Sequence, residues 1–263
     1  MPNHIINEVR LSCDGKRLEE ILNAIQRDPT DPPEAAREGY GTIDFNKLIP
    51  MPEELNIESG SATFVAAELY LTFLNPHADW FGDPEKKLTE EQFGELLARA
   101  NSCRMFTKHK GDIGPENITE RMLGGPVDEM MELGKKAIAN VEKYGAMTWY
   151  DWRTNPKNWN TKWNAYDCSY QGDGVLRFQT AWTAPHPVIR KLSETYPDVA
   201  ISHEWADEDI GYNCGRMRYL GGERTEEYYP CRKKDACLFA EKLWEQGADE
   251  PDVKNELKMT EEA

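Results

Sequence analysis

Hydrophobic and polar residues alternate with two different periods along the chain, and each period predicts its own kind of element. Residues 4–11 alternate as a strand does, and four apolar residues at helical spacing follow between positions 18 and 25, after the capping residue Asp14. Residues 43–49 alternate again, and Pro50 forces an extended exit. This opening part therefore predicts a strand, a helix and a second strand.

The middle of the chain has the helical period. A capping box, Thr89-Glu90-Glu91-Gln92, stands before one apolar stripe, and a second stripe follows Pro126. Glycine and proline pairs separate these stripes, as they do between helices. Residues 61–145 are therefore expected to form a mainly helical block of three or more helices, whose methionines and aromatic residues pack its core.

The period of two returns in the last part of the chain. Residues 163–170 and 175–182 alternate on either side of Gly172-Asp173-Gly174, which predicts a β-hairpin. The same two periods give the remaining elements: a helix opened by Pro185 and closed at Pro197, strands over 199–205 and 211–219, a turn at Gly221-Gly222, and a final helix over 236–244.

Short helices between mostly antiparallel strands indicate an α+β fold. The order of elements fits a ferredoxin-like antiparallel sheet of the split βαβ type, with helices on one face. We expect this domain to comprise residues 1–60 and 146–244, with 61–145 as a helical insertion. Residues 245–263 hold seven acidic side chains and two lysines and are expected to form a flexible acidic tail.

The charge balance narrows the class of partner. The 263 residues include 47 acidic and 31 basic side chains, which gives a net charge of −16. An acidic chain repels duplex phosphate, so binding to duplex DNA is not expected, whereas a partner with a basic surface is favoured. No apolar run nears the roughly 20 residues that span a bilayer, so no membrane contact is expected.

The start of the chain and its cysteines both predict the compartment. The N-terminal residues lack the charged and apolar regions of a secretory signal, which predicts a cytoplasmic protein. The six cysteines are spread over the chain without a CxxC pair. In a reducing compartment they are expected to be free thiols and not a disulfide or metal framework.

Four segments resemble a known family. They are residues 1–7 (MPNHIIN), 43–55 (IDFNKLIPMPEEL), 158–165 (NWNTKWNA) and 178–185 (FQTAWTAP), the last followed by Tyr196-Pro197 and Glu208-Asp209-Ile210-Gly211. Together they resemble the YubB-type proteins of phages and plasmids, whose C-terminal part is a ferredoxin-like domain. The resemblance implies this fold and a mobile-element setting, but no catalytic residue. The word ferredoxin-like refers to topology, since the chain lacks the clustered cysteines of an iron–sulfur site.

One cluster of polar residues invites a metal or catalytic interpretation. His203 and Glu204 are adjacent on a predicted strand, so their side chains point to opposite faces, and His203 shares its face with apolar residues. Metal ligands must converge on one point, so no metal, cofactor or catalytic residue is predicted. Three acids that follow are candidates for contact with a basic partner: Asp207, Glu208 and Asp209.

The most aromatic stretch, residues 149–182, is also the one gap in the negative charge. Aromatic rings exposed on a four-stranded sheet stack unpaired bases in some nucleic-acid-binding proteins, and the same rings can instead pack the helical insertion onto the sheet. The candidate binding residues in this stretch are Trp149, Trp152, Arg153, Lys157, Trp159, Lys162 and Trp163.

Three functions remain open at this point. The first is a non-enzymatic acidic binding protein of a phage or plasmid that contacts a basic host protein, in its sharpest form a counter-defence inhibitor of a nuclease or CRISPR effector. The second is a binding module for single-stranded nucleic acid that uses exposed tryptophans. The third is an enzyme whose site the sequence does not reveal. We expect the first.

Overall fold

The structure is a computed structural model that describes residues 3–27, 42–77, 87–109 and 127–245. The chain divides into two compact units, called here the sheet unit, residues 1–50 with 155–263, and the helical unit, residues 51–154. The expected boundaries after residues 60 and 145 fall within ten residues of these divisions. Apart from Glu245, the expected acidic tail lies outside the described residues.

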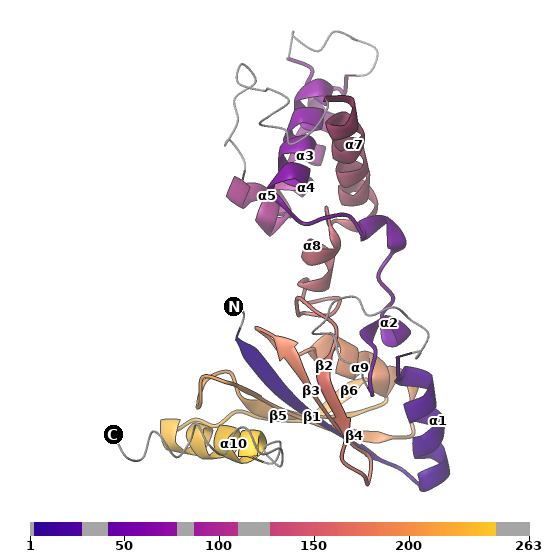
Figure 1. Ribbon diagram of the computed structural model, residues 1–263, viewed down its shortest axis with the longest axis vertical. Coiled ribbons are helices and arrows are strands. Elements are labelled where there is room, and N and C mark those ends of the chain that lie inside the picture. Colours follow the sequence, from indigo (N-terminus) through magenta and orange to yellow (C-terminus); the bar gives the residue numbers. More distant parts are fainter. Residues whose placement is uncertain (1–2, 28–41, 78–86, 110–126, 246–263) are drawn as a thin grey trace. The chain divides into compact units, whose positions relative to one another are not determined.

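The described part of the sheet unit contains six strands (Figure 1): β1 (His4–Ser12), β2 (Tyr166–Tyr170), β3 (Val175–Ala181), β4 (Ala200–Asp207), β5 (Gly215–Leu220) and β6 (Glu223–Tyr228). All pair antiparallel, in the order β2-β3-β1-β4-β5-β6. The first four strands, with α1 (Gly15–Ile25) after β1 and α9 (His186–Thr195) after β3, have the ferredoxin-like order, and β5 and β6 extend it. The predicted α+β class is confirmed.

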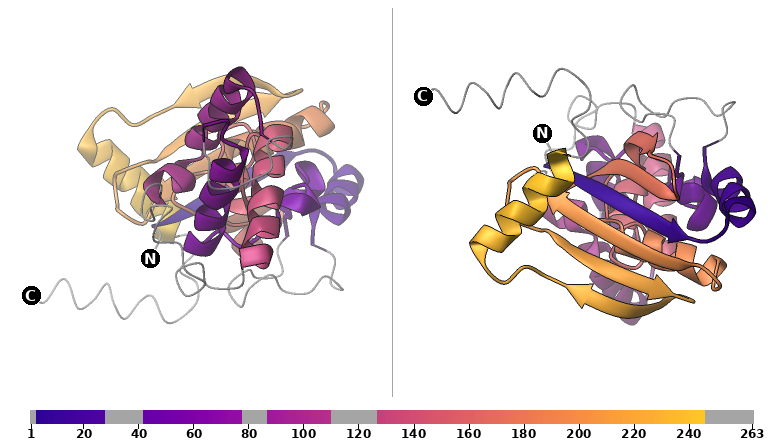
Figure 2. Two further views of the ribbon diagram at one scale, coloured as in Figure 1. Left: turned by 90° about the horizontal axis from the view of Figure 1, so that it is seen from above. Right: turned by 90° about the horizontal axis from the view of Figure 1, so that it is seen from below.

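Helices lie on both faces of the sheet, which corrects the expectation of one. On one face, His186 of α9 packs its ring against His203 and Trp205 of β4. On the other, α10 (Lys233–Glu245) buries Ala236, Ala240 and Leu243 against the cross-strand pair Ile6 and Ala206. Figures 1 and 2 show α10 lying along the sheet. We call the two surfaces the α9 face and the α10 face. A few apolar side chains on the α10 face give the apolar stripe of α10 a place to pack.

The second predicted strand is wrong, because residues 45–48 form the short helix α2 (Phe45–Leu48). Asp44 caps this turn by accepting a hydrogen bond from the Asn46 N–H at 2.9 Å. Asn164 supports the cap twice, since its Oδ1 accepts from the Phe45 N–H at 2.9 Å and its Nδ2 donates to Asp44 at 2.7 Å. An alternation over seven residues was too short to exclude a capped turn.

The end of the sheet also differs from the expectation. The strand predicted over 211–219 begins only at Gly215, because Gly211 and Asn213 have positive φ angles of 83° and 35°. The turn at Gly221-Gly222 is confirmed, with φ angles of 58° and 80°, and it leads into β6, which was not predicted. β6 has the sequence ERTEEY, with no apolar alternation, as suits an edge strand that faces water.

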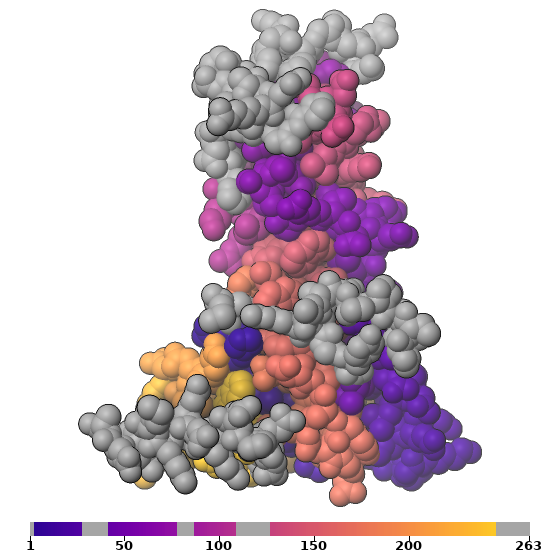
Figure 3. Space-filling model, in the orientation of Figure 1, coloured from indigo at the N-terminus to yellow at the C-terminus, as the bar shows by residue number. Residues whose placement is uncertain are grey.

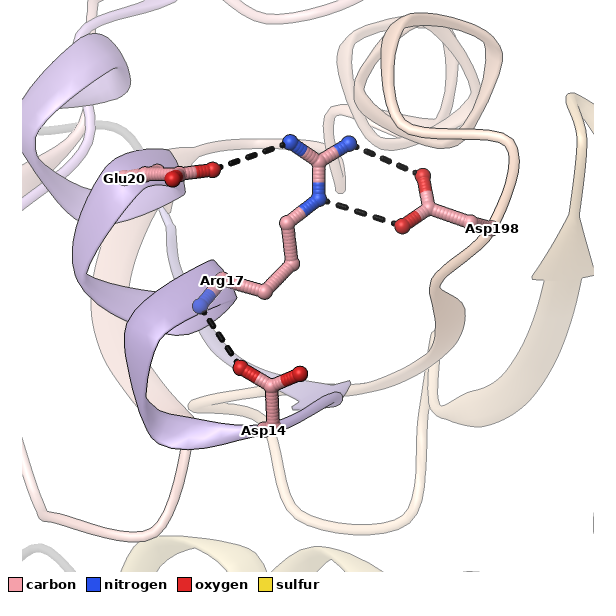
Figure 4. A network of polar contacts seen from close by, with 4 residues as sticks. All are labelled: Asp14, Arg17, Glu20 and Asp198. Atoms are coloured by element: carbon pink, nitrogen blue, oxygen red, sulfur yellow. Dashed lines mark hydrogen bonds and ion pairs between the residues drawn. The ribbon is translucent and has the colours of Figure 1, made fainter.

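The remaining predictions for the sheet unit hold. The hairpin turn between β2 and β3 has Gly172 and Gly174 at positive φ angles of 86° and 76°. Asp14 caps α1 by accepting a hydrogen bond from the Arg17 N–H. The Arg17 guanidinium in turn binds both oxygens of Asp198, at 2.9 and 3.1 Å, and so ties α1 to the turn after α9 (Figure 4). In Figure 3, α1 is the indigo surface of this unit.

The helical unit confirms the predicted helical block. Its described elements are η1 (Glu53–Leu55), α3 (Ser61–Leu74), α4 (Glu90–Ser102), α5 (Arg104–His109), α7 (Val127–Tyr144) and α8 (Trp149–Arg153). The capping box of Thr89 and Gln92 is present at the start of α4. α3 and α7 approach closely at Gly134, where a Cβ would lie 2.1 Å from the Ala66 carbonyl oxygen.

Candidate functional site

Two of the four candidate tryptophans are core residues. Trp159 is 0% exposed, donates its Nε1–H to the Ile49 carbonyl at 2.9 Å, and packs edge-on against Phe45. Trp152 is 7% exposed. At both positions the burial favours the packing alternative over base stacking, because large aromatic side chains stabilise a fold most when they are buried. Trp149 and Trp163 are partly exposed.

The cations beside these tryptophans are divided between the two units. Arg153 is buried, with its guanidinium 5.2 Å from the Trp149 ring, in the helical unit. In the sheet unit, Lys162 lies 4.8 Å from the Trp163 ring and 5.2 Å from the Trp182 ring. Lys157 is exposed. The candidate stretch therefore belongs to two different units and supplies one partly exposed cation–aromatic group, at Lys162.

Two of the three candidate acids at the end of β4, Asp207 and Glu208, hold the start of the chain in place. Asp207 is 6% exposed and accepts hydrogen bonds from Asn3 Nδ2 at 3.2 Å and from the Asp209 N–H at 2.9 Å. Glu208 accepts from the His4 N–H at 3.0 Å. Only Glu208 and Asp209 are exposed, so the acidic cluster offered to a partner is smaller than expected.

His203 lies in the core of the α9 face, and Glu204 lies on the opposite face, as alternation along the strand predicts. The Asn7 amide donates to the Ile5 carbonyl at 2.9 Å and to Thr180 Oγ1 at 3.0 Å, so its oxygen accepts from His203 Nε2 at 3.1 Å. Burial lowers the pKa of His203 well below 6.5, and burial followed by the charge of Arg224 lowers that of His186 to about 4. Both rings are therefore neutral at pH 7.

The thiols and carboxylates offer no assembled reactive site in the described parts of the chain. Burial raises the pKa of Cys103 and of Cys168 to about 12, so neither is a thiolate at pH 7. Burial also raises the pKa of Asp151 in the helical unit. Among the described residues, no group of three His, Cys, Asp or Glu side chains is placed to hold a metal ion.

The most prominent polar arrangement is a row of charged side chains across the α10 face. Strand register places Arg177 of β3 opposite Glu8 of β1, Glu8 opposite Glu204 of β4, Glu204 opposite Arg216 of β5, and Arg216 opposite Tyr228 of β6. Like charges directly opposite each other destabilise a sheet, so the Glu8–Glu204 pair needs neighbouring cations. Arg177 lies 3.2 Å from Glu8, and Arg216 lies 3.5 Å from Glu204.

Two adjoining hollows lie on this row beside α10, and together we call them the α10 groove. The first, of about 200 Å³, is lined by Glu8, Arg10, Ser202, Glu204 and Lys242. The second, of about 280 Å³, is lined by Glu204, Arg216, Tyr228, Phe239, Lys242 and Leu243. Glu204 and Lys242 belong to both, so the hollows form one continuous feature with a strand floor and a helix wall.

The buried Arg177 fixes the position of α10 over this face. Its side chain is 4% exposed, and its guanidinium donates both to Glu8 and to the Leu243 carbonyl near the C-terminal end of α10. A cation at a helix C-terminus is favourable because the last carbonyls have no partner within the helix. Trp244 adds a second tie, since its Nε1–H donates to the Asp207 carbonyl at 3.0 Å.

The sequence analysis missed the α10 groove, although part of its signal was present. Arg10 and Glu8 occupy alternate positions of β1, as Ser202 and Glu204 do in β4 and Arg216 and Arg218 in β5. Polar residues at alternate positions of three neighbouring strands indicate a sheet face that is only partly covered by other elements. What the sequence could not supply was the register that puts these positions in one row.

A match to a known family agrees with the fold of the sheet unit. Residues 158–250 match the family described as "Ferredoxin-like domain in Api92-like protein". The crystal structure of a protein Api92 from Yersinia pseudotuberculosis is similar, with a TM-score of 0.37 and 11% sequence identity, over 88% of this chain and 99% of that one. No curated protein matches significantly. No helix in the described ranges is long and apolar enough to cross a bilayer. The C-terminal part of the chain is thus related to a family with a ferredoxin-like domain.

Proposed function

We propose that this protein acts by binding a partner and not by catalysis. The observation that carries the proposal is that two histidines of the sheet unit and two cysteines are shielded from water and used for packing. His203 and His186 are neutral and packed in the core, and burial keeps the Cys103 and Cys168 thiols protonated at pH 7. An acid–base or nucleophilic mechanism needs such groups poised near their working pKa and open to substrate.

The partner we propose is a protein with a basic surface. The net charge of −16 favours such a partner by speeding the encounter and by repelling nucleic acid duplexes. The resemblance of four sequence segments to YubB-type proteins favours a phage or plasmid setting for this contact. In its sharpest form the proposal names a nuclease or CRISPR effector with a basic groove as the partner. This proposal includes a cytoplasmic site of action.

The test is affinity capture of host proteins by the immobilised full chain, at low and at moderate salt. A basic protein that is retained at about 50 mM salt and released at about 300 mM salt would support the proposal, because screening weakens exposed charge pairs. Asp209→Lys, at the exposed end of the acid cluster, is expected to weaken the capture more than the matched reversal Glu19→Lys on α1. Recovery of background proteins alone at low salt would contradict the proposal.

A further inference from the structure

The charge of the described residues is distributed differently from that of the whole chain. The described residues hold 31 acidic and 25 basic side chains, so they account for six of the sixteen net negative charges. Within the sheet unit, the described residues hold 19 acidic and 17 basic side chains. The folded sheet unit is thus nearly neutral, and one locally positive surface on it suffices to attract an anion.

The α10 groove is such a surface. Its lining and the adjacent side chains of the same face hold five cations and three carboxylates: Arg10, Arg177, Arg216, Arg218 and Lys242 against Glu8, Glu204 and Glu226. Each of the three carboxylates already pairs with a cation of the same face. Glu8 pairs with Arg177 and lies 3.6 Å from Arg10, and Glu226 binds both Arg216 and Arg218, at 3.0 and 2.7 Å.

Lys242 is the cation in this groove that is most available to a ligand. It is exposed on α10, lines both hollows, and has no ion-pair partner among the described residues. Arg10, which also lines the first hollow, is half-exposed, and its ion pair with Glu8 is long, at 3.6 Å. These two side chains can donate hydrogen bonds to phosphate oxygens while the arginines of the floor keep their glutamates.

The far end of the groove offers an aromatic ring beside these cations. Tyr228 is 40% exposed, its ring lies 6.1 Å from that of Phe239, and the Arg216 guanidinium sits 5.5 Å from the Tyr228 centroid. A half-exposed ring with a guanidinium and a second ring beside it offers a stacking surface for a flat base. A base within a duplex is already stacked on both sides, so only an unpaired base can use this ring.

We propose that the α10 groove binds single-stranded nucleic acid, with phosphates at Lys242 and Arg10 and a base stacked on Tyr228. The site is distinct from the tryptophan stretch suggested by the sequence. It also stands apart from the proposed protein contact, because it depends on the cations of the α10 face and not on the acidic residues. Each of the two proposals can therefore fail without the other.

The test is a fluorescence anisotropy titration of a labelled short oligothymidine with the full chain. Because only two or three cations contact phosphate, log Kd should rise with log salt with a slope of about 2, which makes binding roughly 15-fold weaker at 200 mM than at 50 mM salt. The same sequence as a duplex should bind far more weakly.

Matched variants separate the groove from general charge. Lys242→Glu should raise Kd by about ten-fold or more, whereas Lys234→Glu, the same change at an exposed position of the same helix, should stay within about two-fold. Tyr228→Ala should raise Kd by about five-fold or more. Circular dichroism establishes that each variant is folded.

Three results would overturn the proposal. One is the absence of any oligonucleotide binding at low salt. Another is equal loss in the Lys242→Glu and Lys234→Glu variants, which would show non-specific attraction. The third is binding that Tyr228→Ala leaves intact while a change at Trp163 abolishes it, which would return the site to the tryptophan stretch. Retention of a basic host protein in the capture experiment would bear on the protein contact alone.

Discussion

The two faces of the six-stranded sheet differ in how they treat polar side chains. On the α9 face, His203 and Asn7 are fully buried, and a chain of hydrogen bonds runs from His203 through Asn7 to Thr180. On the α10 face, the charged side chains of the strand row are paired with one another, and all but Arg177 are partly exposed. The comparison teaches that one face of a sheet can stabilise the fold by buried contacts while the other face stays accessible to a ligand.

The largest expected difference between the faces concerns two aromatic side chains. Trp205 on the α9 face is 2% exposed, and Tyr228 on the α10 face is 40% exposed. We expect Trp205→Ala to lower the free energy of unfolding by about 3–5 kcal/mol, because it leaves a large cavity. Tyr228→Ala should cost less than about 1 kcal/mol. Urea denaturation followed by circular dichroism measures both, and equal losses would remove the distinction between the faces.

The next largest effect is expected at Arg177, a buried charge of the α10 face. Arg177→Met leaves Glu8 and the Leu243 carbonyl without their cation and should cost about 3 kcal/mol. The double variant Glu8→Leu with Arg177→Met should recover much of this loss, since it removes both charges together. If the single variant were as stable as the wild type, Arg177 would not be what holds α10 on the sheet.

The two histidines in the core of the α9 face are expected to make the free energy of unfolding depend on pH. His186 and His203 stay neutral in the folded protein, whereas the unfolded chain protonates both near pH 6.5. The unfolded state therefore binds more protons below pH 6.5, and the free energy of unfolding should fall there by up to about 1.4 kcal/mol per pH unit for each histidine. Above that pH the contribution is constant.

Urea denaturation between pH 7.5 and pH 5 measures this slope against other titrating groups. His186→Gln should make the dependence on pH shallower by about one proton, whatever its effect on stability at pH 7. A slope that His186→Gln does not alter would show that this ring titrates alike in the folded and unfolded states.

The smallest effect on stability is expected at the open end of the charged row. Glu204 and Arg216 are each 29% exposed and lie 3.5 Å apart, so Glu204→Gln should change the free energy of unfolding by less than about 1 kcal/mol. The same substitution removes a negative charge from the α10 groove and should tighten oligonucleotide binding by about two- to five-fold. Weaker oligonucleotide binding by Glu204→Gln would contradict a groove that attracts phosphate by its positive charge.

Local signals allowed the sequence to predict much of the fold. β1, the Asp14 cap, the hairpin at Gly172–Gly174 and the core position of His203 follow from period, capping and turn chemistry within a few residues. α2 was missed because the Asn164 amide that supports its cap comes from far along the chain. β6 was missed because an edge strand that faces water shows no apolar alternation.

The candidate site was less accessible from the sequence for a similar reason. The α10 groove depends on strand register between residues almost two hundred positions apart, such as Glu8 and Glu204. In addition, α10 forms one wall of the groove, and no local sequence pattern predicts where on the sheet this helix packs. The tryptophans attracted attention through composition, but composition does not distinguish a buried ring such as Trp159 from an exposed one.

The central claim is that the α10 face binds a ligand while the α9 face stabilises the fold. It is tested most directly by NMR, in a titration of the ¹⁵N-labelled chain with short oligothymidine. The account predicts shift changes confined to the α10 face, at Arg10, Ser202, Arg216, Tyr228 and Lys242, with the amides of His203 and Asn7 unmoved. Changes centred on Trp149 and Trp163, or no change at saturating oligonucleotide and low salt, would contradict it.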